Sequence, residues 1–159
     1  MSPDADPTRQ NHLAPLQDLL RHMEGDIARL YAERGVTVRT RFSIVLIRLR
    51  HRGPMTVREL AGEIDVTHSA MSQTVAALRR QGMVESSPGP DARTRTVSLT
   101  GRGRDTVPFL EAEWRATEAS LAELEAELPY PLTRVVADIT DALRRRSFRD
   151  RIVAHLESP

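Results

Sequence analysis

The stretch TVRELAGEIDVTHSAMSQTVAALRRQG, residues 56–82, decides the fold. Its first part predicts a short helix over residues 57–64. Thr56 is a good N-cap residue, and Glu59 follows three positions later, which is the spacing of a reciprocal capping box. The stretch therefore opens with a helix whose start is fixed by its own side chains.

The second part of the stretch predicts another helix, over residues 68–81. Thr67 can cap its start, and Gly82 is the residue preferred just past a helix end. A turn at Asp65 and Val66 joins the two helices, and we expect Val66 to be buried at this hinge. One apolar face of the second helix consists of Met71, Val75 and Leu78. Two capped helices joined by so short a turn are typical of a helix-turn-helix, whose second helix lies in the DNA major groove.

The residues that follow predict a β-hairpin. Residues 83–86 are short and extended, and the tip at 88–91 contains two prolines and a glycine. Residues 93–100 alternate strictly, so that Val97 and Leu99 can anchor the strand to the core while the other face stays polar. A hairpin directly behind a helix-turn-helix is the arrangement of a winged helix.

Helical spacing dominates the rest of the chain. We expect helices over residues 13–34 and 39–51, closed at Gly35 and at Gly53 with Pro54. The last third predicts a long helix from about residue 100 and a final helix carrying apolar residues from 132 to 156. The fold class expected is mainly α with a small β-hairpin wing.

The long helix carries an apolar seam with alternating three- and four-residue spacing. The seam consists of Val107, Leu110, Trp114, Thr117, Leu121, Leu124 and Leu128. This spacing is typical of a helix that packs along another helix, either within one chain or between two copies. Pro108 lies in the first turns, where we expect a kink or a late start.

The amino-acid composition limits the kinds of protein that this chain can be. The chain has 159 residues, enough for one compact domain, and no cysteine, which excludes disulfides and thiol-based sensing. All 23 basic residues are arginine. Residues 39–104 hold 12 arginines against five acidic residues, whereas residues 105–143 hold two against nine. A basic middle region of this kind suits a polyanionic partner.

The N-terminal residues are acidic and rich in proline, without the apolar segment of a secretion signal. We expect residues 1–12 to be a disordered lead-in and the protein to be cytoplasmic. The longest aliphatic run, residues 44–47, is too short to span a bilayer, so no membrane partner is expected.

The early exposed side chains of the second helix are the candidates for reading bases. They are Thr67, His68, Ser69, Ser72 and Gln73. Gln73 can bond bidentately to adenine, and the small serines allow close approach to the bases. Thr67 and the helix start can also bind a phosphate. Arg79 and Arg80 lie two to three turns later and suit the DNA backbone. The alternative is an ordinary solvated helix face, and it carries most weight for His68.

The hairpin supplies a second set of candidates. Asp91 and Arg93 are two apart, so an ion pair between them can fix the tip, and Arg93 and Arg95 project with it. Arginine on a narrow hairpin suits the negative potential of the minor groove. The alternative is that these arginines only keep an edge strand soluble.

The order of these elements resembles the MarR family of winged-helix regulators. The likeness rests on the helix-turn-helix of residues 56–84, the Asp-x-Arg at 91–93 and the exit VSLTGRG at 97–103. It implies a homodimer that grips a pseudo-palindromic DNA site with two recognition helices and two wings. Many relatives carry arginine where Gln73 stands, so the bases read here are expected to differ.

The resemblance also implies a division of the chain and a dimer interface. It assigns residues 13–38 to an N-terminal dimerisation helix, 39–103 to the DNA-binding region and 104–159 to C-terminal dimerisation helices, intertwined as one domain. The expected interface residues are Leu16, Leu20, Trp114, Leu121, Leu124, Leu128, Ile152 and Leu156.

The function expected is a DNA-binding transcriptional repressor, released by a small aromatic or anionic effector. Aromatic side chains that could line an effector pocket are Tyr31, Phe42, Phe109 and Trp114, although core packing explains them as well. The alternative function is a winged-helix protein-interaction module. No nucleophile–base pair or phosphate loop is evident, so an enzyme is not expected, and neither is a cofactor. The five histidines share no metal-binding spacing.

Overall fold

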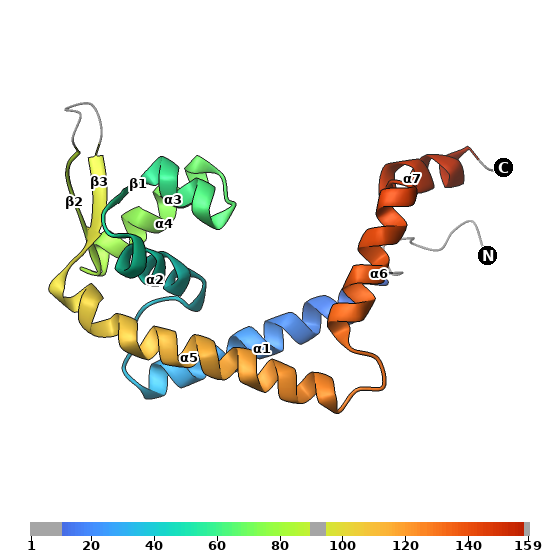
Figure 1. Cartoon of the computed structure of the whole chain (residues 1–159), viewed down its shortest axis with the longest axis horizontal. Helices are drawn as coiled ribbons and strands as arrows, with labels where there is room; N and C mark the ends of the chain where they lie inside the picture. The colour runs from blue at the N-terminus through green and yellow to red at the C-terminus, as the bar shows by residue number, and fades with distance from the viewer. Residues whose placement is uncertain (1–10, 90–94, 158–159) are drawn as a thin grey trace, which may run out of the picture. The chain divides into compact units, whose positions relative to one another are not determined.

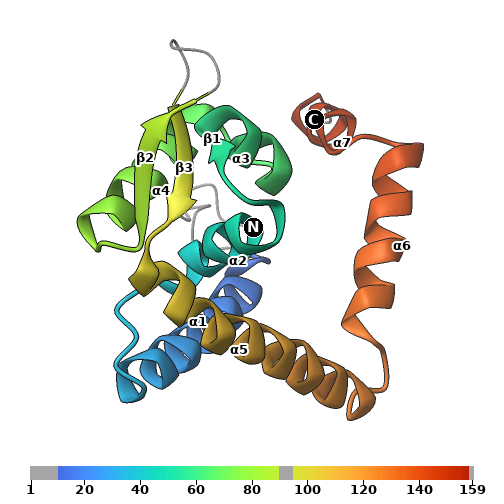
Figure 2. The same ribbon diagram turned by 60° about the vertical axis from the view of Figure 1, so that its left-hand side comes forward.

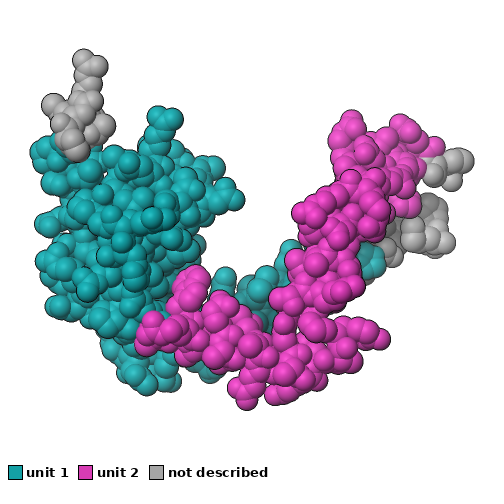
Figure 3. Space-filling view, viewed as in Figure 1, with its two compact units in different colours: residues 1–111 teal, residues 112–159 magenta. Residues whose placement is uncertain are grey.

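The computed structural model describes residues 11–89 and 95–157, which fall into two compact units, 1–111 and 112–159 (Figure 3). In the first unit the elements follow one another as labelled in Figure 1. They are α1 (Ala14–Glu33), a 3-10 turn (Thr40–Phe42), α2 (Ser43–Arg52), β1 (Met55–Thr56), α3 (Val57–Ile64), α4 (His68–Arg80), β2 (Val84–Pro88), β3 (Arg95–Leu99) and the start of α5 (Gly101–Ala126). The expected fold class is confirmed.

The helix-turn-helix forms as its capping residues predict. The backbone N–H of Glu59 donates to the Thr56 hydroxyl at 3.2 Å, and the Thr56 N–H donates to the Glu59 carboxylate at 2.7 Å. The Thr67 hydroxyl caps α4 by accepting from the Ala70 N–H at 3.2 Å. Gly82 ends the segment with a φ of 69°, a backbone conformation that favours glycine.

The prediction that Val66 is buried is wrong. Asp65 adopts the left-handed conformation with a φ of 56°, and the Val66 N–H then bonds to the Ala61 carbonyl at 3.0 Å. This closure holds Val66 outside the core, with its side chain 42% exposed. Leu60 and Met71 take the buried positions of the two helices instead.

The wing belongs to a three-stranded antiparallel sheet with the order β1-β3-β2, seen beside α3 and α4 in Figure 2. Central strand β3 pairs Val97 with Met55 on one side and with Ser86 on the other. Val97 and Leu99 are buried, as their alternation predicts. Strand β1 was not predicted, because two residues after a Gly-Pro turn are too few to show alternation.

One core holds the first unit together. Its fully buried side chains are Val45, Leu46, Leu60, Met71, Leu78, Met83, Val97, Val107 and Leu110. The start of α5 joins this core, because the Thr100 hydroxyl accepts from the Gly103 N–H at 3.1 Å and donates to the Gly82 carbonyl at 2.6 Å. The helix therefore begins at Gly101, ahead of Pro108, so of the two effects expected of this proline the late start does not occur.

The second unit contains the remainder of α5, then α6 (Leu132–Arg145) and α7 (Phe148–Leu156). The Glu125 carboxylate accepts from the Thr133 N–H at 2.7 Å and so ties the start of α6 to α5. The expected single final helix is wrong. The chain turns extended at Arg146, and Ser147 caps a new helix by accepting from the Asp150 N–H at 3.1 Å.

Candidate nucleic-acid interface

Helix α4 separates a buried face from a polar one. Met71, Val75 and Leu78 are 2%, 5% and 0% exposed and pack into the core. On the opposite side, Thr67, His68, Ser69 and Gln73 are exposed, and Ser72 is half-buried. The structure thus places all five candidates for base reading on the first two turns of a single helix, and four of them face solvent.

The C-terminal end of α4 adds positive charge to this polar face. Arg79 and Arg80 are both exposed and lie in the last turn of the helix. Neither forms an ion pair with any residue that the structure describes. Their charges are therefore available to an anionic partner.

A groove of about 660 Å³ runs along one side of α4. It lies between that helix and the segment that leads into α2, and its floor includes apolar side chains such as Phe42 and Val66. Its polar lining consists of Arg39, Arg41, Gln73, Thr74, Arg80 and Gln81. We call it the arginine groove, because three arginines and no acidic residue line it in the described part of the chain.

Sequence reasoning missed Arg39 and Arg41 as interface residues. They precede α2, outside the helix-turn-helix itself, and only folding brings them beside Gln73 and Arg80. The sequence did contain one indication that these two arginines are exposed. Arg39 and Arg41 stand between apolar Val38 and Phe42. Val38 and Phe42 are buried and both arginines are exposed, so the two apolar neighbours hold the arginines outward.

The described part of the wing shows one of its predicted residues. Arg95 is exposed at the start of β3, and its guanidinium donates to the Ser86 carbonyl at 3.2 Å. The neighbouring Ser87 and Thr96 hydroxyls share a hydrogen bond of 3.2 Å across the two strands. Asp91 and Arg93, with their predicted ion pair, lie outside the described residues.

The aromatic residues considered for an effector pocket divide into two sets. Tyr31 and Phe42 are buried in the core of the first unit, and Tyr31 meets Phe109 edge-to-face with ring centroids 5.4 Å apart. Trp114 belongs to the second unit and is 43% exposed. Core packing thus accounts for Tyr31 and Phe42.

The residues expected at a dimer interface have large exposed apolar surfaces. In the second unit, Leu124 and Leu128 are 51% and 52% exposed, and no apolar side chain described there is buried. On α1, Leu16 and Leu20 are likewise exposed, as are Ile152 and Leu156 on α7, while Leu121 is half-buried. The first seam residues, Val107 and Leu110, are instead buried in the core of the first unit.

Helix α6 lies in the segment expected to dimerise, and it presents a further apolar face whose residues were not among the expected interface residues. It consists of Leu132, Val135, Val136, Ile139 and Leu143, all exposed. Their helical spacing was visible in the sequence, but the spacing alone does not tell whether a face is covered by the same chain.

Beyond these surfaces, the described residues show few features of a catalytic, metal-binding or membrane-spanning protein. The pKa of the Glu59 carboxyl lies below its ordinary value, because it accepts hydrogen bonds from the Thr56 backbone and from the Thr56 hydroxyl. Within residues 11–89 and 95–157, no group of three histidine or acidic side chains could hold a metal ion. In the same residues, no helix is both long and apolar enough to cross a membrane.

Solved structures of bacterial regulators share this fold. The chain is 26% identical to a transcriptional regulator of M. tuberculosis, MOSR, solved with DNA, at a TM-score of 0.57, covering 86% of this chain and 96% of that one. MepR of S. aureus, also solved with DNA, is 15% identical at a TM-score of 0.65, with 86% and 98% covered. The heme sensor PefR of Streptococcus agalactiae, solved with heme, is 15% identical at a TM-score of 0.61, with 89% and 97% covered.

The sequence itself matches the model of one protein family. Residues 34–94, which include α2, the helix-turn-helix and β2, match the MarR family. No curated protein sequence matches the chain. The match covers the helix-turn-helix, and the likeness to the solved structures, which cover most of the chain, is one of fold. Over residues 34–94 the chain is therefore similar to the MarR family, and it has the winged-helix fold of the solved transcriptional regulators MOSR and MepR.

Proposed function

We propose that the protein is a homodimeric, sequence-specific DNA-binding transcriptional regulator that represses a pseudo-palindromic site until a small molecule releases it. The DNA-binding part of this proposal rests on the polar, outer face of α4. Serines, a glutamine and a histidine stand on its first two turns, and two exposed arginines follow at its end. The DNA complexes of MOSR and MepR support this assignment through the shared fold.

Each part of the interface takes a distinct role in this proposal. Ser69, Ser72 and Gln73 read base edges in the major groove, where a glutamine pairs well with adenine. His68 faces the same groove from the helix start, Thr67 and the first amide groups of the helix bind a phosphate, and Arg79 and Arg80 contact the backbone further along. The wing, with Asp91 bracing Arg93 and with Arg95 behind them, enters the minor groove.

Dimerisation is proposed from the apolar surface that a single chain leaves exposed. The second unit has no apolar core of its own among its described residues, although α5, α6 and α7 carry many large apolar side chains. Pairing with the same surface of a second copy would bury them through an isologous interface. In this scheme residues 13–38 and 104–159 dimerise and residues 39–103 bind DNA.

The regulatory part of the proposal is drawn from the family. PefR, which shares the fold, was solved with heme as a heme sensor. For this chain we propose a small aromatic or anionic effector whose binding lowers the affinity for DNA. Measuring DNA binding in the presence of candidate compounds, at fixed salt, tests this part.

A titration of random duplex DNA at two salt concentrations tests the DNA-binding part. A protein that neutralises phosphates releases counterions, so its affinity falls steeply as salt rises. We expect fluorescence polarisation to show strong binding at low salt and a large loss at the higher concentration. A flat response, or no binding at low salt, would favour the alternative of a protein-interaction module.

A further inference from the structure

The arginine groove extends the surface offered to DNA beyond the recognition helix and the wing. We propose that Arg39 and Arg41 clamp the phosphates of the DNA strand beside α4, together with Arg80. This inference rests on the proposed function, because it places the groove against the same duplex. It assigns a binding role to the segment before α2.

The position of Arg39 and Arg41 is fixed by the fold. Thr37, two residues before Arg39, accepts through its carbonyl from the Gln81 side chain at 3.3 Å and through its hydroxyl from Arg102 at 3.3 Å. On the other side of the pair, the Ser43 hydroxyl donates to the Thr40 carbonyl at 2.7 Å. The backbone that carries the two arginines is thus tied to α4 and to α5.

Arg41 is also held by its side chain. The carbon centre of its guanidinium lies 5.2 Å from the centroid of the Phe42 ring, within the range of a cation–π contact. Phe42 itself is 6% exposed, so its ring is a fixed platform. An arginine positioned in this way loses less conformational entropy when it meets a phosphate.

The charges in the groove have no counterpart among the described residues. Arg39, Arg41 and Arg80 form no ion pair there, and all three are exposed. Three guanidinium groups along one groove repel each other and attract a polyanion. Gln73 lines the same groove, so a strand whose bases it reads would bring its phosphates past these arginines.

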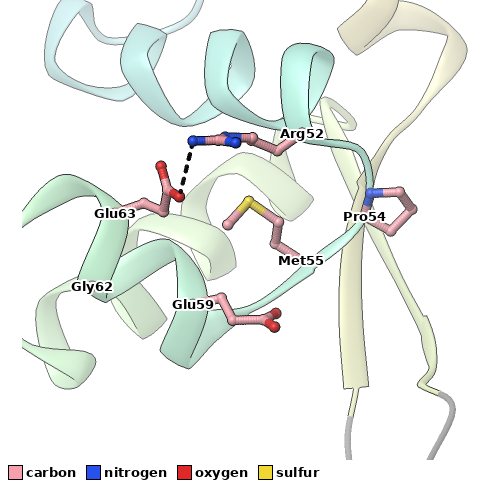
Figure 4. A pocket seen from close by; sticks show the side chains of 6 residues that line it. All are labelled: Arg52, Pro54, Met55, Glu59, Gly62 and Glu63. Carbon is pink, nitrogen blue, oxygen red and sulfur yellow. Dashed lines mark ion pairs between the residues drawn. The ribbon is translucent and has the colours of Figure 1, made fainter.

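Two other arginines of α2 provide the contrast. Arg48 and Arg52 lie 3.5 Å and 3.6 Å from the Glu63 carboxylate. Figure 4 shows the guanidinium of Arg52 turned toward Glu63 in a second cavity, lined also by Met55 and Glu59. Both guanidinium groups are engaged by the one Glu63 carboxylate, so we assign them no part in DNA binding.

The test compares two double variants that remove the same charge. In one, Arg39 and Arg41 become alanine; in the control, Arg48 and Arg52 become alanine. Binding of a random duplex is followed by fluorescence polarisation over a series of salt concentrations. Each arginine that no longer neutralises a phosphate reduces the slope of log K against log salt by about 0.9, so the slope of the first variant should fall by about 1.8 per chain and by about 3.6 for the proposed dimer.

The expected result is a flatter slope for the Arg39/Arg41 variant and an unchanged slope for the control. Because phosphate contacts carry no sequence information, affinity should fall alike for all duplexes. Equal slopes in both variants would overturn this inference alone. A wild-type chain that binds no duplex at low salt would overturn the proposed function as well.

A second pair of substitutions guards against loss of folding. Arg39→Gln with Arg41→Gln removes the charges but keeps an unbranched polar side chain at both positions. Thermal unfolding should show the same midpoint as wild type, and the salt slope should still be flatter. A wild-type slope in this folded variant contradicts the phosphate clamp.

Discussion

Gly103 shows how one residue controls the junction between the sheet and α5. A Cβ atom built there would lie 2.1 Å from the Met83 carbonyl oxygen, a backbone atom that cannot easily move away. We therefore predict that Gly103→Ala lowers the free energy of unfolding by about 1–3 kcal/mol, the usual range for overpacking. Urea unfolding followed by circular dichroism measures this change.

Gly101 is the matched control, because it lies in the same first turn of α5 and a Cβ there meets nothing within 4 Å. Gly101→Ala should leave stability unchanged or raise it by up to about 1 kcal/mol, since alanine favours helix. Equal effects of the two substitutions would show that the contact at Met83 is unimportant.

Gln73 is the residue on which base reading depends most in the proposed function. It is exposed on the second turn of α4, among side chains too small to make bidentate contacts. We expect Gln73→Ala to weaken the cognate site by about 1–3 kcal/mol while random duplex binds nearly as before. Competition binding with both duplexes measures the difference. If cognate and random binding are both unaltered, another residue reads the bases.

At the scale of elements, the capping box of α3 makes part of the stability depend on pH. The pKa of Glu59 is lowered chiefly by the Thr56 backbone N–H and then by the Thr56 hydroxyl. A lowered pKa in the folded state means that the ionised carboxylate stabilises the fold above its unfolded-state pKa. This contribution is lost as the pH falls through the folded-state value.

We predict that Glu59→Gln is less stable than wild type at neutral pH and that the gap narrows as the pH falls. Urea unfolding across a series of pH values tests this. Thr56→Ala, which keeps the backbone N–H, should retain more of the pH dependence than Glu59→Gln does. A gap that stays constant with pH would contradict the assigned cause.

The apolar face of α6 gives the prediction for dimerisation. Ile139 is 54% exposed on that face, whereas Ala137 lies on the opposite side of the helix. Ile139→Asp should sediment as a single chain at concentrations where wild type has twice the 17.8 kDa chain mass. Ala137→Asp, which adds the same charge, should remain dimeric. A dimer indifferent to Ile139→Asp would move the interface away from α6.

Elements with strong local signals could be predicted from the sequence, and those set by distant contacts could not. The capped helices at 57–64 and 68–80 form where Thr56, Thr67 and Gly82 place their ends. Strand β1 is a different case, because its two residues are extended only through pairing with β3. The break between α6 and α7 was missed because the apolar spacing continues across it, although Ser147 with Asp150 is a recognisable cap.

The residues of the candidate site likewise include some that could be predicted from the sequence and some that could not. The polar face of α4 could be read from the sequence because a helix places residues 69, 72 and 73 together by its own periodicity. Arg39 and Arg41 could not, since they reach the arginine groove only because α2 packs against α3, which in turn packs against α4. The exposure of Val66 depended on the closure of a turn, which sequence patterns do not specify.

At the scale of the whole molecule, the charge distribution separates the proposed roles. The region that carries the winged helix, residues 39–104, holds most of the arginines, and residues 105–143 are strongly acidic. Like charge on the latter region and on DNA would repel, so the acidic helices are expected to face away from the duplex. In the proposed function the basic region would contact the DNA, and the exposed apolar side chains of the remaining helices would pair two copies.

The central claim is that a two-fold dimer reads DNA with two copies of α4. Selection of bound fragments from genomic DNA, followed by sequencing and by the mass of the complex, tests it most directly. We expect a shared pseudo-palindrome with half-sites about 10 bp apart, centre to centre, bound by one dimer. Fragments that share no two-fold-related motif, or that are bound by a single chain, would contradict it.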